Sequence, residues 1–220
     1  DYTQAIKYKP DLMIIPECES LDKISAPEKS DSCWIGDNIH KGLGIFSFND
    51  FKIEIYKNYI DKFKYILPIT ISNATKSYKV IAVWTKKVEE RKKNHINYIK
   101  QLYLALEEYK EFIDNDNVII CGDLNSNLFW KRTGIDKNHQ DVLDQLTANN
   151  IYSAYHHFYN EKQGKETQAT YYHYHKKDRP FHIDFCFLSK NLIENLKNME
   201  IGKYEDWIKL SDHVPLIIDI

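Results

Sequence analysis

The chain has 220 residues, of which 43% are hydrophobic and 14% aromatic, so one ordered domain over residues 1–220 is expected. Its net charge is −2, so no overall basic field attracts nucleic acid, and any polyanion must bind at a local patch. No apolar run reaches the length of a membrane-spanning helix.

The first half of the chain is predicted to be mainly strands. Residues 1–9 resemble the end of a helix, which Pro10 stops because proline disfavours helix in the residue before it. Runs of β-branched and aromatic residues then predict five strands, at Asp11–Ile15, Leu43–Phe48, Phe51–Tyr56, Tyr65–Ile71 and Tyr78–Trp84.

Two helices and further strands are predicted after residue 88. Apolar residues recur at spacings of three and four over 89–113, and a second helix is predicted over 139–148 with Asn138 as its cap. The remaining apolar runs predict strands at Val118–Cys121, Ala169–Tyr174, Phe181–Leu188 and Val214–Asp219. Strands on both sides of two helices favour an α/β sandwich of mixed sheets.

The cysteines and the first residues of the chain indicate the cellular compartment in which the protein is expected to work. Cys18, Cys33, Cys121 and Cys186 show no CxxC spacing, which disfavours a zinc knuckle and suits the reducing cytoplasm. An exported protein with paired cysteines is the alternative. The chain does not begin with Met or with a signal peptide, so we expect that it is trimmed.

The segment Gly122-Asp123-Leu124-Asn125 follows a buried strand. Side chains alternate along an extended chain, so Asp123 and Asn125 point to the same side. Asp123 could accept a proton from water, and Asn125, which does not ionise, could orient water or phosphate. The alternative is an ordinary Gly-Asp turn at a strand end.

Two further polar segments interrupt or precede apolar strands. Asp184 lies within the run 181–188, where an unpaired carboxylate is costly. It could bind metal or hold a histidine in one tautomer, and the alternative is an ion pair with Arg179 or His182. Asp212 and His213 can reach one site together only if the backbone turns between them.

Other polar residues are weaker candidates. Glu17 follows the first strand and could ligate a metal, although Glu19 could do so instead. Substrate contacts are predicted, with less support, at Lys86, Lys87, His156 and His157. His173 and His175 could share a strand face and bind zinc, but cleft-lining histidines are the favoured interpretation.

Taken together, these segments resemble the endonuclease/exonuclease/phosphatase superfamily, which includes exonuclease III and DNase I. The shared pattern is a Glu after an early strand, then Gly-Asp-x-Asn, Ile-Asp-aromatic and Ser-Asp-His. It is matched here by Glu17 and by the segments 122–125, 183–185 and 211–213. Order and spacing agree across residues 11–220, and segments 17–19, 40–44 and 153–157 resemble a bacterial branch of this superfamily.

The resemblance implies a four-layer, DNase I-like fold of two mixed sheets flanked by helices. It implies that Glu17 and Asp212 bind Mg²⁺ or Mn²⁺. It also implies that Asp123 activates water or contacts the transition state, with Asn125 beside it. Asp184 would then orient His213, which would contact the scissile phosphate.

The chain departs from the superfamily pattern at two places. The family's first strand, which contributes an Asn to the metal shell, is expected to precede residue 1. Trp84 stands where the family has a Tyr or His that assists the phosphate or the leaving group, and an indole has no useful acid–base chemistry. Another group would have to take that role, with Trp84 left as a substrate-binding candidate.

The leading hypothesis is a metal-dependent phosphodiesterase that cleaves P–O bonds in DNA as an endonuclease or exonuclease. The nearly neutral charge favours a rival, an esterase for a small or lipid phosphate. A third hypothesis is a binding module with a weakened site. No membrane or protein partner is implied.

Overall fold

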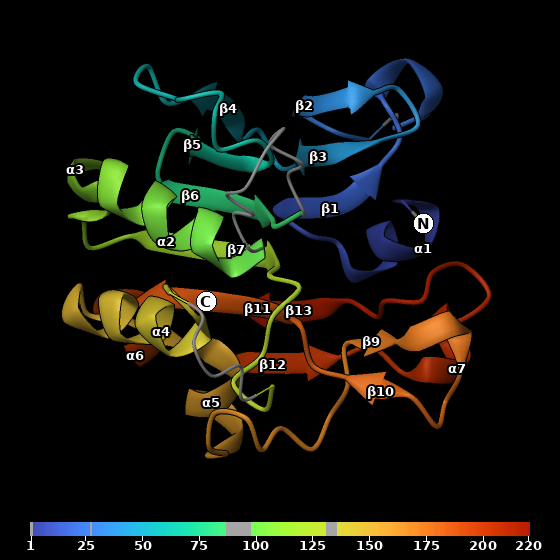
Figure 1. Ribbon diagram of the computed structural model, residues 1–220. Coiled ribbons are helices and arrows are strands. Elements are labelled where there is room, and N and C mark those ends of the chain that lie inside the picture. Colours follow the sequence, from blue (N-terminus) through green and yellow to red (C-terminus); the bar gives the residue numbers. More distant parts are fainter. Residues whose placement is uncertain (1, 27, 87–97, 131–135) are drawn as a thin grey trace, which may run out of the picture.

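The computed structural model describes residues 2–26, 28–86, 98–130 and 136–220. Two main sheets lie face to face (Figure 1). The smaller sheet is antiparallel, in the order β1 (Leu12–Cys18), β3 (Lys41–Ser47) and β2 (Asp31–Asn38). The larger sheet is mixed, in the order β4 (Lys52–Ile55), β5 (Ile66–Ser72), β6 (Ser77–Trp84), β7 (Val118–Asp123), β11 (Asp184–Ser189) and β8 (Ile151–Ser153).

Short elements complete the fold. Two strand pairs join β9 (Tyr171–Tyr172) to β10 (Pro180–Phe181) and β12 (Asn198–Ile201) to β13 (Leu216–Asp219). The α-helices are α1 (Tyr2–Ala5), α2 (Tyr98–Glu108), α3 (Lys110–Ile113), α4 (His139–Ala148), α5 (Ala154–Tyr159), α6 (Lys190–Glu194) and α7 (Tyr204–Trp207). The 3₁₀ turns are η1 (Ile6–Tyr8), η2 (Leu21–Lys23) and η3 (His173–His175). Among the described helices, none has the length and apolarity needed to cross a membrane.

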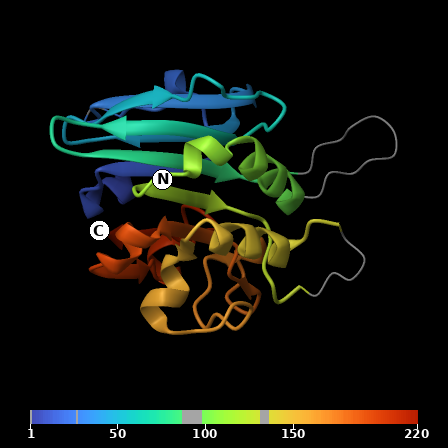
Figure 2. The same ribbon diagram turned by 90° about the vertical axis from the view of Figure 1, so that its left-hand side faces the viewer.

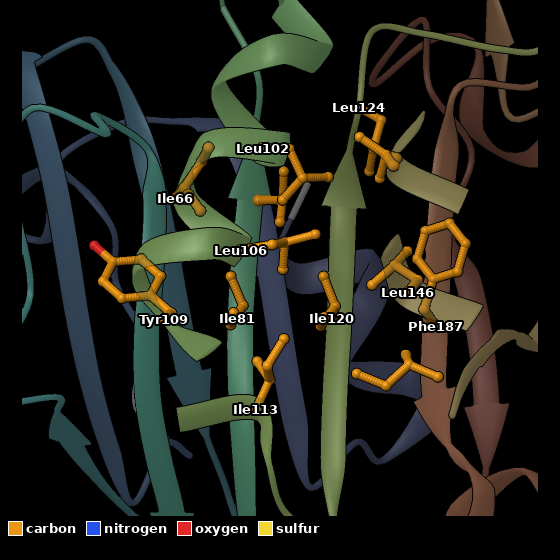
Figure 3. Packing of buried hydrophobic residues seen from close by; sticks show 14 of the residues in the cluster. Ile66, Ile81, Leu102, Leu106, Tyr109, Ile113, Ile120, Leu124, Leu146 and Phe187 are labelled. Carbon is orange, nitrogen blue, oxygen red and sulfur yellow. The ribbon is translucent and has the colours of Figure 1, made fainter. Parts of the chain in front are cut away.

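Strand β6 shows how side-chain alternation builds the layers. Ile81 and Val83 face α2, whereas Val80, Ala82 and Trp84 face the other sheet. Figure 3 shows the helix side of this core, which Leu102 and Leu106 of α2 fill above the strands. Burial of a Leu or Ile side chain contributes about 1.5–3 kcal/mol, so α2 is held mainly by its apolar face.

The fold has four layers, which are helices, the larger sheet, the smaller sheet and helix α1. Two further apolar clusters hold them together, one between the sheets and one on the outer face of the smaller sheet. Leu43 and Ile45 of β3 pack with Leu67 and Ile69 of β5. On the other face of the smaller sheet, the Tyr2 ring of α1 meets Phe46 edge-on. In Figure 2, α2 and α4 lie at one side of the sheets and α1 at the other. The predicted α/β sandwich of sheets flanked by helices is therefore confirmed; among the described residues the larger sheet is mixed and the smaller one is antiparallel.

Local predictions succeeded where the sequence signal was strong. Helix α4 spans His139–Ala148 as predicted, and Asn138 and Asp141 form a capping box at its start. The predicted helix 89–113 is described only from Tyr98, and it breaks at Tyr109 into α2 and α3. Residues 89–97 of that prediction lie outside the described residues.

The prediction of a strand over Ala169–Tyr174 is wrong beyond Tyr172. Only Tyr171–Tyr172 is extended, and η3 follows, with Tyr174 and His175 in left-handed conformations. His173 and His175 therefore do not share a strand face. The Tyr171 hydroxyl lies 2.8 Å from His173 Nδ1, and His175 Nδ1 lies 3.0 Å from the Ile208 carbonyl oxygen.

Candidate active site

Several of the predicted site residues lie where strands end or begin at one edge of the sheets. Strand β7 ends at Asp123 and β11 begins at Asp184, and the two residues are directly opposite in the antiparallel register. Figure 1 shows the carboxyl ends of β1, β6 and β7 pointing to the same side. This arrangement brings polar segments that are far apart in sequence to one edge of the sheets. We call this edge, where β1 and β7 end and β11 begins, the rim.

Asn125 holds the carboxylate of Asp123 in place. The Asn125 backbone N–H donates to Asp123 Oδ1 at 2.7 Å, and its side-chain Nδ2 donates to Oδ2 at 2.7 Å. The same Nδ2 also donates to the Thr85 carbonyl at 3.0 Å. Both amide hydrogens are thus used, which leaves Asn125 Oδ1 as the acceptor that can meet water.

The backbone of this segment requires the glycine at position 122. Gly122 has φ 141°, and a Cβ atom there would lie 1.8 Å from the Val83 carbonyl oxygen. The parallel ladder places Val83 and Gly122 side by side. Only a residue without a Cβ lets β6 approach β7 this closely just before Asp123.

We expect Gly122→Ala to destabilise the fold by about 2–4 kcal/mol, because the clash is with backbone and no rotamer relieves it. Urea unfolding measures this loss. Gly164→Ala is the matched control, since Gly164 also has a positive φ, of 74°, but its nearest clash would be at 3.0 Å. The control should lose about 1 kcal/mol. Equal losses in the two variants would show that backbone strain, and not the close approach to Val83, sets the cost.

His213 reaches the site because the backbone bends at Asp212. This bend meets the condition that the sequence set for the two residues to act together. His213 Nδ1 lies 2.9 Å from Asp184 Oδ2. The prediction that Asp184 orients His213 is therefore supported by a direct contact, and neither Arg179 nor His182 pairs with Asp184 among the hydrogen bonds of the described residues.

The charges at the site shift two pKa values upward. Burial lowers the pKa of His213, but the negative charge and hydrogen bond of Asp184 outweigh it and raise the pKa to about 9. Burial and the facing charge of Asp184 raise the pKa of Asp123 well above its usual range. The nearby imidazolium and the Asn125 N–H oppose that rise. His213 is thus a cation at neutral pH, and Asp123 is a strong base for a carboxylate.

Thr170 and Tyr171 are site residues that the sequence reasoning missed. The Thr170 hydroxyl accepts the backbone N–H groups of Ile183 and Asp184, each at 3.0 Å. Tyr171 forms an isolated antiparallel bridge with His213, and their rings lie 4.7 Å apart. Neither residue belongs to a recognisable motif, because their roles depend on contacts made only in the folded chain.

A β-bulge directs Glu17 to the same rim. The β1–β3 register shifts between Ile15 and Cys18, and Glu17 takes a left-handed φ of 59°. Its charge is felt by both Asp123 and Tyr171, whose pKa values it raises. Its Oε2 lies 2.7 Å from Lys41 Nζ.

The other candidate for this role, Glu19, lies apart. Its Oε1 lies 3.8 Å from Lys23 Nζ and 3.7 Å from His40 Nδ1. Among the two acidic residues that the sequence could not separate, Glu17 is the one that faces the site.

The ligand atoms that lie together differ from the predicted metal pair. Among the described residues, only Asp123, Asp184 and His213 offer three ligand atoms within 4.8 Å of one another. Glu17 and Asp212 are not in this group, although the charge of Asp212 acts on His213 and Tyr171. A protonated imidazole has no free lone pair for a metal, so this group is better suited to phosphate and proton transfer.

A hard divalent cation would nevertheless fit the rim. Burial raises the pKa of Tyr171, and the negative charges of Asp212, Asp123 and Glu17 raise it further, so this region carries several carboxylate charges. Carboxylate oxygens are the ligands that Mg²⁺ and Mn²⁺ prefer. A cation there would also offset the like charges that drive Asp123 towards protonation.

The weaker substrate-contact predictions have mixed outcomes. Trp84 is buried beside Asp123 in the β6–β7 register, and Lys86 lies just beyond it. Lys87 lies outside the described residues. His157 is exposed on α5, whereas His156 is largely buried.

The two ring nitrogens of His156 already have partners, so His156 supports the fold more than it faces a substrate. Nδ1 lies 2.7 Å from Ser153 Oγ, and Nε2 lies 3.0 Å from Glu166 Oε1. Asn127 donates its side-chain amide to both Glu166 and the His182 carbonyl oxygen. This network ties the loop after Asp123 to the segment before Asp184.

We expect Glu166 to stabilise the fold in a pH-dependent way. Burial raises its pKa, but hydrogen bonds from His156, Gly164 and Asn127 outweigh that effect and lower the pKa to about 2. The stabilisation is therefore complete above the unfolded-state pKa of about 4.5 and is lost as pH falls towards 2.

Urea unfolding at pH 6 and at pH 3 tests this expectation. Glu166→Gln should be less stable than wild type by on the order of 2 kcal/mol at pH 6, with the difference shrinking at pH 3. Glu108→Gln, at an exposed pair with Lys62, is the control and should show almost no difference. A Glu166→Gln deficit that is the same at both pH values would contradict the assignment.

Solved structures share this fold at low sequence identity. The 3′–5′ exonuclease NExo of Neisseria meningitidis matches with TM-score 0.71 and 16% identity, covering 96% of this chain and 89% of that one. The chain therefore shares its fold with nucleases, among them AP endonucleases and a retrotransposon endonuclease domain. The resemblance predicted from four short segments is thus confirmed at the level of the fold.

Two further structures give the same result. An AP endonuclease from Archaeoglobus fulgidus matches with TM-score 0.68 and 16% identity, covering 100% of this chain and 93% of that one. The 3′ phosphatase NExo from Neisseria, bound to a product DNA hairpin, matches with TM-score 0.70 and 17% identity over 99% and 92% of the chains. No protein-family model matches the chain, and no curated protein does.

Proposed function

We propose that this protein is a Mg²⁺- or Mn²⁺-dependent phosphodiesterase that hydrolyses P–O bonds in DNA. The observation that carries the proposal is the group of Asp123, Asp184 and His213, with Asn125 fixing Asp123. A buried basic carboxylate next to a histidine cation suits hydrolysis of a phosphate ester, in which water loses a proton while negative charge builds on phosphate oxygens.

The residues have distinct roles in this proposal. Asp123 accepts the proton of the attacking water, and Asn125 Oδ1 orients that water. His213 donates a hydrogen bond and positive charge to a phosphate oxygen, and Asp184 keeps the imidazole protonated and correctly turned. Glu17 and Asp212 would hold the metal ion, which supplies further stabilisation of charge on the phosphate when bound.

Three observations support DNA and a cytoplasmic location. The structural neighbours include an exonuclease and an AP endonuclease, and one was solved with a product DNA hairpin. Lysines gather at the rim despite the net charge of −2. The four cysteines are unpaired thiols, as expected of a protein that works in the reducing cytoplasm.

The rival is a phosphatase or phosphodiesterase for a small or lipid phosphate ester. A panel with Mg²⁺ or Mn²⁺ separates them, using plasmid, abasic-site duplex, single-stranded DNA and bis-p-nitrophenyl phosphate, with EDTA as the control. We expect metal-dependent DNA cleavage. Turnover of the small ester alone would select the rival, and no turnover of any substrate would favour a binding module.

A further inference from the structure

Two lysine ammonium groups lie close to the indole ring of Trp84. The indole is 2% exposed and belongs to the core between the sheets. Lys41 Nζ lies 5.8 Å from the centroid of the ring, and Lys86 Nζ lies 5.1 Å from it. Both distances are within the range in which the negative face of an indole attracts a cation. Trp84 cannot act as an acid or a base, but its indole ring can still hold the ammonium groups of Lys41 and Lys86 in position.

The two lysines come from different sheets and are held by separate contacts. Lys41 is the first residue of β3, whereas Lys86 follows β6 by two residues. The backbone carbonyl of Lys86 accepts the side-chain amide of the buried Gln101 of α2. Lys86 Nζ also lies 5.0 Å above the Tyr65 ring, which packs against Trp84 at 4.7 Å. The Lys86 ammonium group thus lies near two aromatic rings, those of Trp84 and Tyr65.

The two rings that contact Lys86, those of Trp84 and Tyr65, lie next to the strand that ends at Asp123. Trp84 is the register partner of Asp123, and the next residue, Thr85, donates its backbone N–H to the Asp123 carbonyl at 2.9 Å. Neighbouring strands are about 4.8 Å apart. Trp84, which both ammonium groups approach, therefore stands one strand away from Asp123. A group bound there would belong to the same substrate but differ from the phosphate that is cleaved.

The ammonium groups have unused hydrogen-bonding capacity. Within residues 2–26, 28–86, 98–130 and 136–220, Lys86 has no carboxylate within 4 Å. Its charge lowers the pKa of Asp37, but the direct partner of Asp37 is Lys64, at 2.8 Å. Lys41 pairs with Glu17, and both side chains are about half exposed, so the pair is weak. Each ammonium has three donors, which suits an anionic ligand.

We propose that Lys41 and Lys86 bind a backbone phosphate next to the scissile one, and that Trp84 is the positioning residue that holds both ammonium groups. This inference rests on the proposed function and narrows its substrate to a strand with consecutive phosphates. An isolated phosphate ester would have nothing to place against the two lysines.

The dependence of DNA binding on salt tests the proposal directly. A fluorescein-labelled single-stranded oligonucleotide is titrated with protein that carries Asp123→Asn, which keeps the DNA intact, in Mg²⁺ and at several salt concentrations. Each lost phosphate contact should reduce the slope of log K against log salt by about 0.7 for a single strand. Because the two lysines share one phosphate, we expect that reduction when Lys41→Gln and Lys86→Gln are combined, and a smaller reduction with several-fold weaker binding for each change alone.

Matched variants separate positioning from general loss of charge or structure. Lys76→Gln removes an exposed lysine at the other end of β6 and should leave the slope unchanged. Trp84→Leu keeps an apolar side chain but removes the ring, so it should reduce the slope as the two lysine changes do together. Trp84→Phe retains a ring and should restore most of the slope. In protein that already carries Trp84→Leu, further loss of either lysine should have little effect.

The outcomes distinguish the inference from the function on which it rests. If wild type cleaves DNA but the lysine variants keep the slope of Lys76→Gln, the lysines do not bind phosphate and the inference fails alone. If Trp84→Leu keeps the full slope, Trp84 does not position them. If the protein neither binds nor cleaves DNA, the proposed function fails and the inference fails with it.

Discussion

Asp123→Asn is expected to lower kcat/KM for DNA by at least about 10³-fold while leaving the fold intact, because it removes the base but keeps the shape of the side chain. Asp123 is 2% exposed, faces Asp184 and has a raised pKa, so its charge is costly in the folded state. Removing that charge offsets the partial loss of the hydrogen bonds from Asn125. We therefore expect the free energy of unfolding to change by less than about 1 kcal/mol.

Cleavage of a labelled oligonucleotide and urea unfolding, both measured on the same preparation, check this expectation. Asp61→Asn, at an exposed carboxylate, is the control and should retain full activity. Activity within tenfold of wild type in Asp123→Asn would show that this carboxylate is not the base. A stability loss of several kcal/mol would instead show that Asp123 is needed chiefly for folding.

Asp184→Asn should lower turnover by about 10²–10⁴-fold and return the pKa of His213 towards its ordinary value of about 6.5. The cause is loss of the carboxylate that lies 2.9 Å from His213 Nδ1 and favours the imidazolium. An NMR titration of the His213 ring measures the pKa directly. The same pKa in wild type and in Asp184→Asn would disprove the pairing, whatever the activity.

The pH dependence of this pair has a definite sign. The folded pKa of His213, about 9, is above its unfolded value, so the pair stabilises the fold fully below about 6.5. That stabilisation is lost as pH rises through 9. Activity that needs the imidazolium should likewise persist at neutral pH in wild type and fall near pH 9. In Asp184→Asn the fall should move towards pH 6.5.

Much of the fold was predictable because local signals agree with the final packing. The capping box and apolar spacing define α4, and the alternation in β5 and β6 follows from one face meeting helices and the other meeting a sheet. Strand β2, Asp31–Asn38, was missed because its residues are partly or fully exposed and carry little apolar pattern. It forms through pairing with β3, which no local signal encodes.

The sequence by itself determined which residue types stand at the strand ends. Asp123, Asn125, Asp184 and His213 were identified from short motifs and their order, because such polar groups are costly beside apolar strands unless they have a use. The family resemblance also predicts a Tyr or His at the position of Trp84, and this comparison stays a prediction.

Only the tertiary structure decided how those residues are placed and charged. A bulge turned Glu17 and not Glu19 to the rim, and the fold brought Lys41 and Lys86 to one indole ring. The pKa of His213 depends on a carboxylate 29 positions away in sequence. Electrostatic and cation–π energies depend on distance and burial, which chain order does not specify before strands from both sheets have paired and packed.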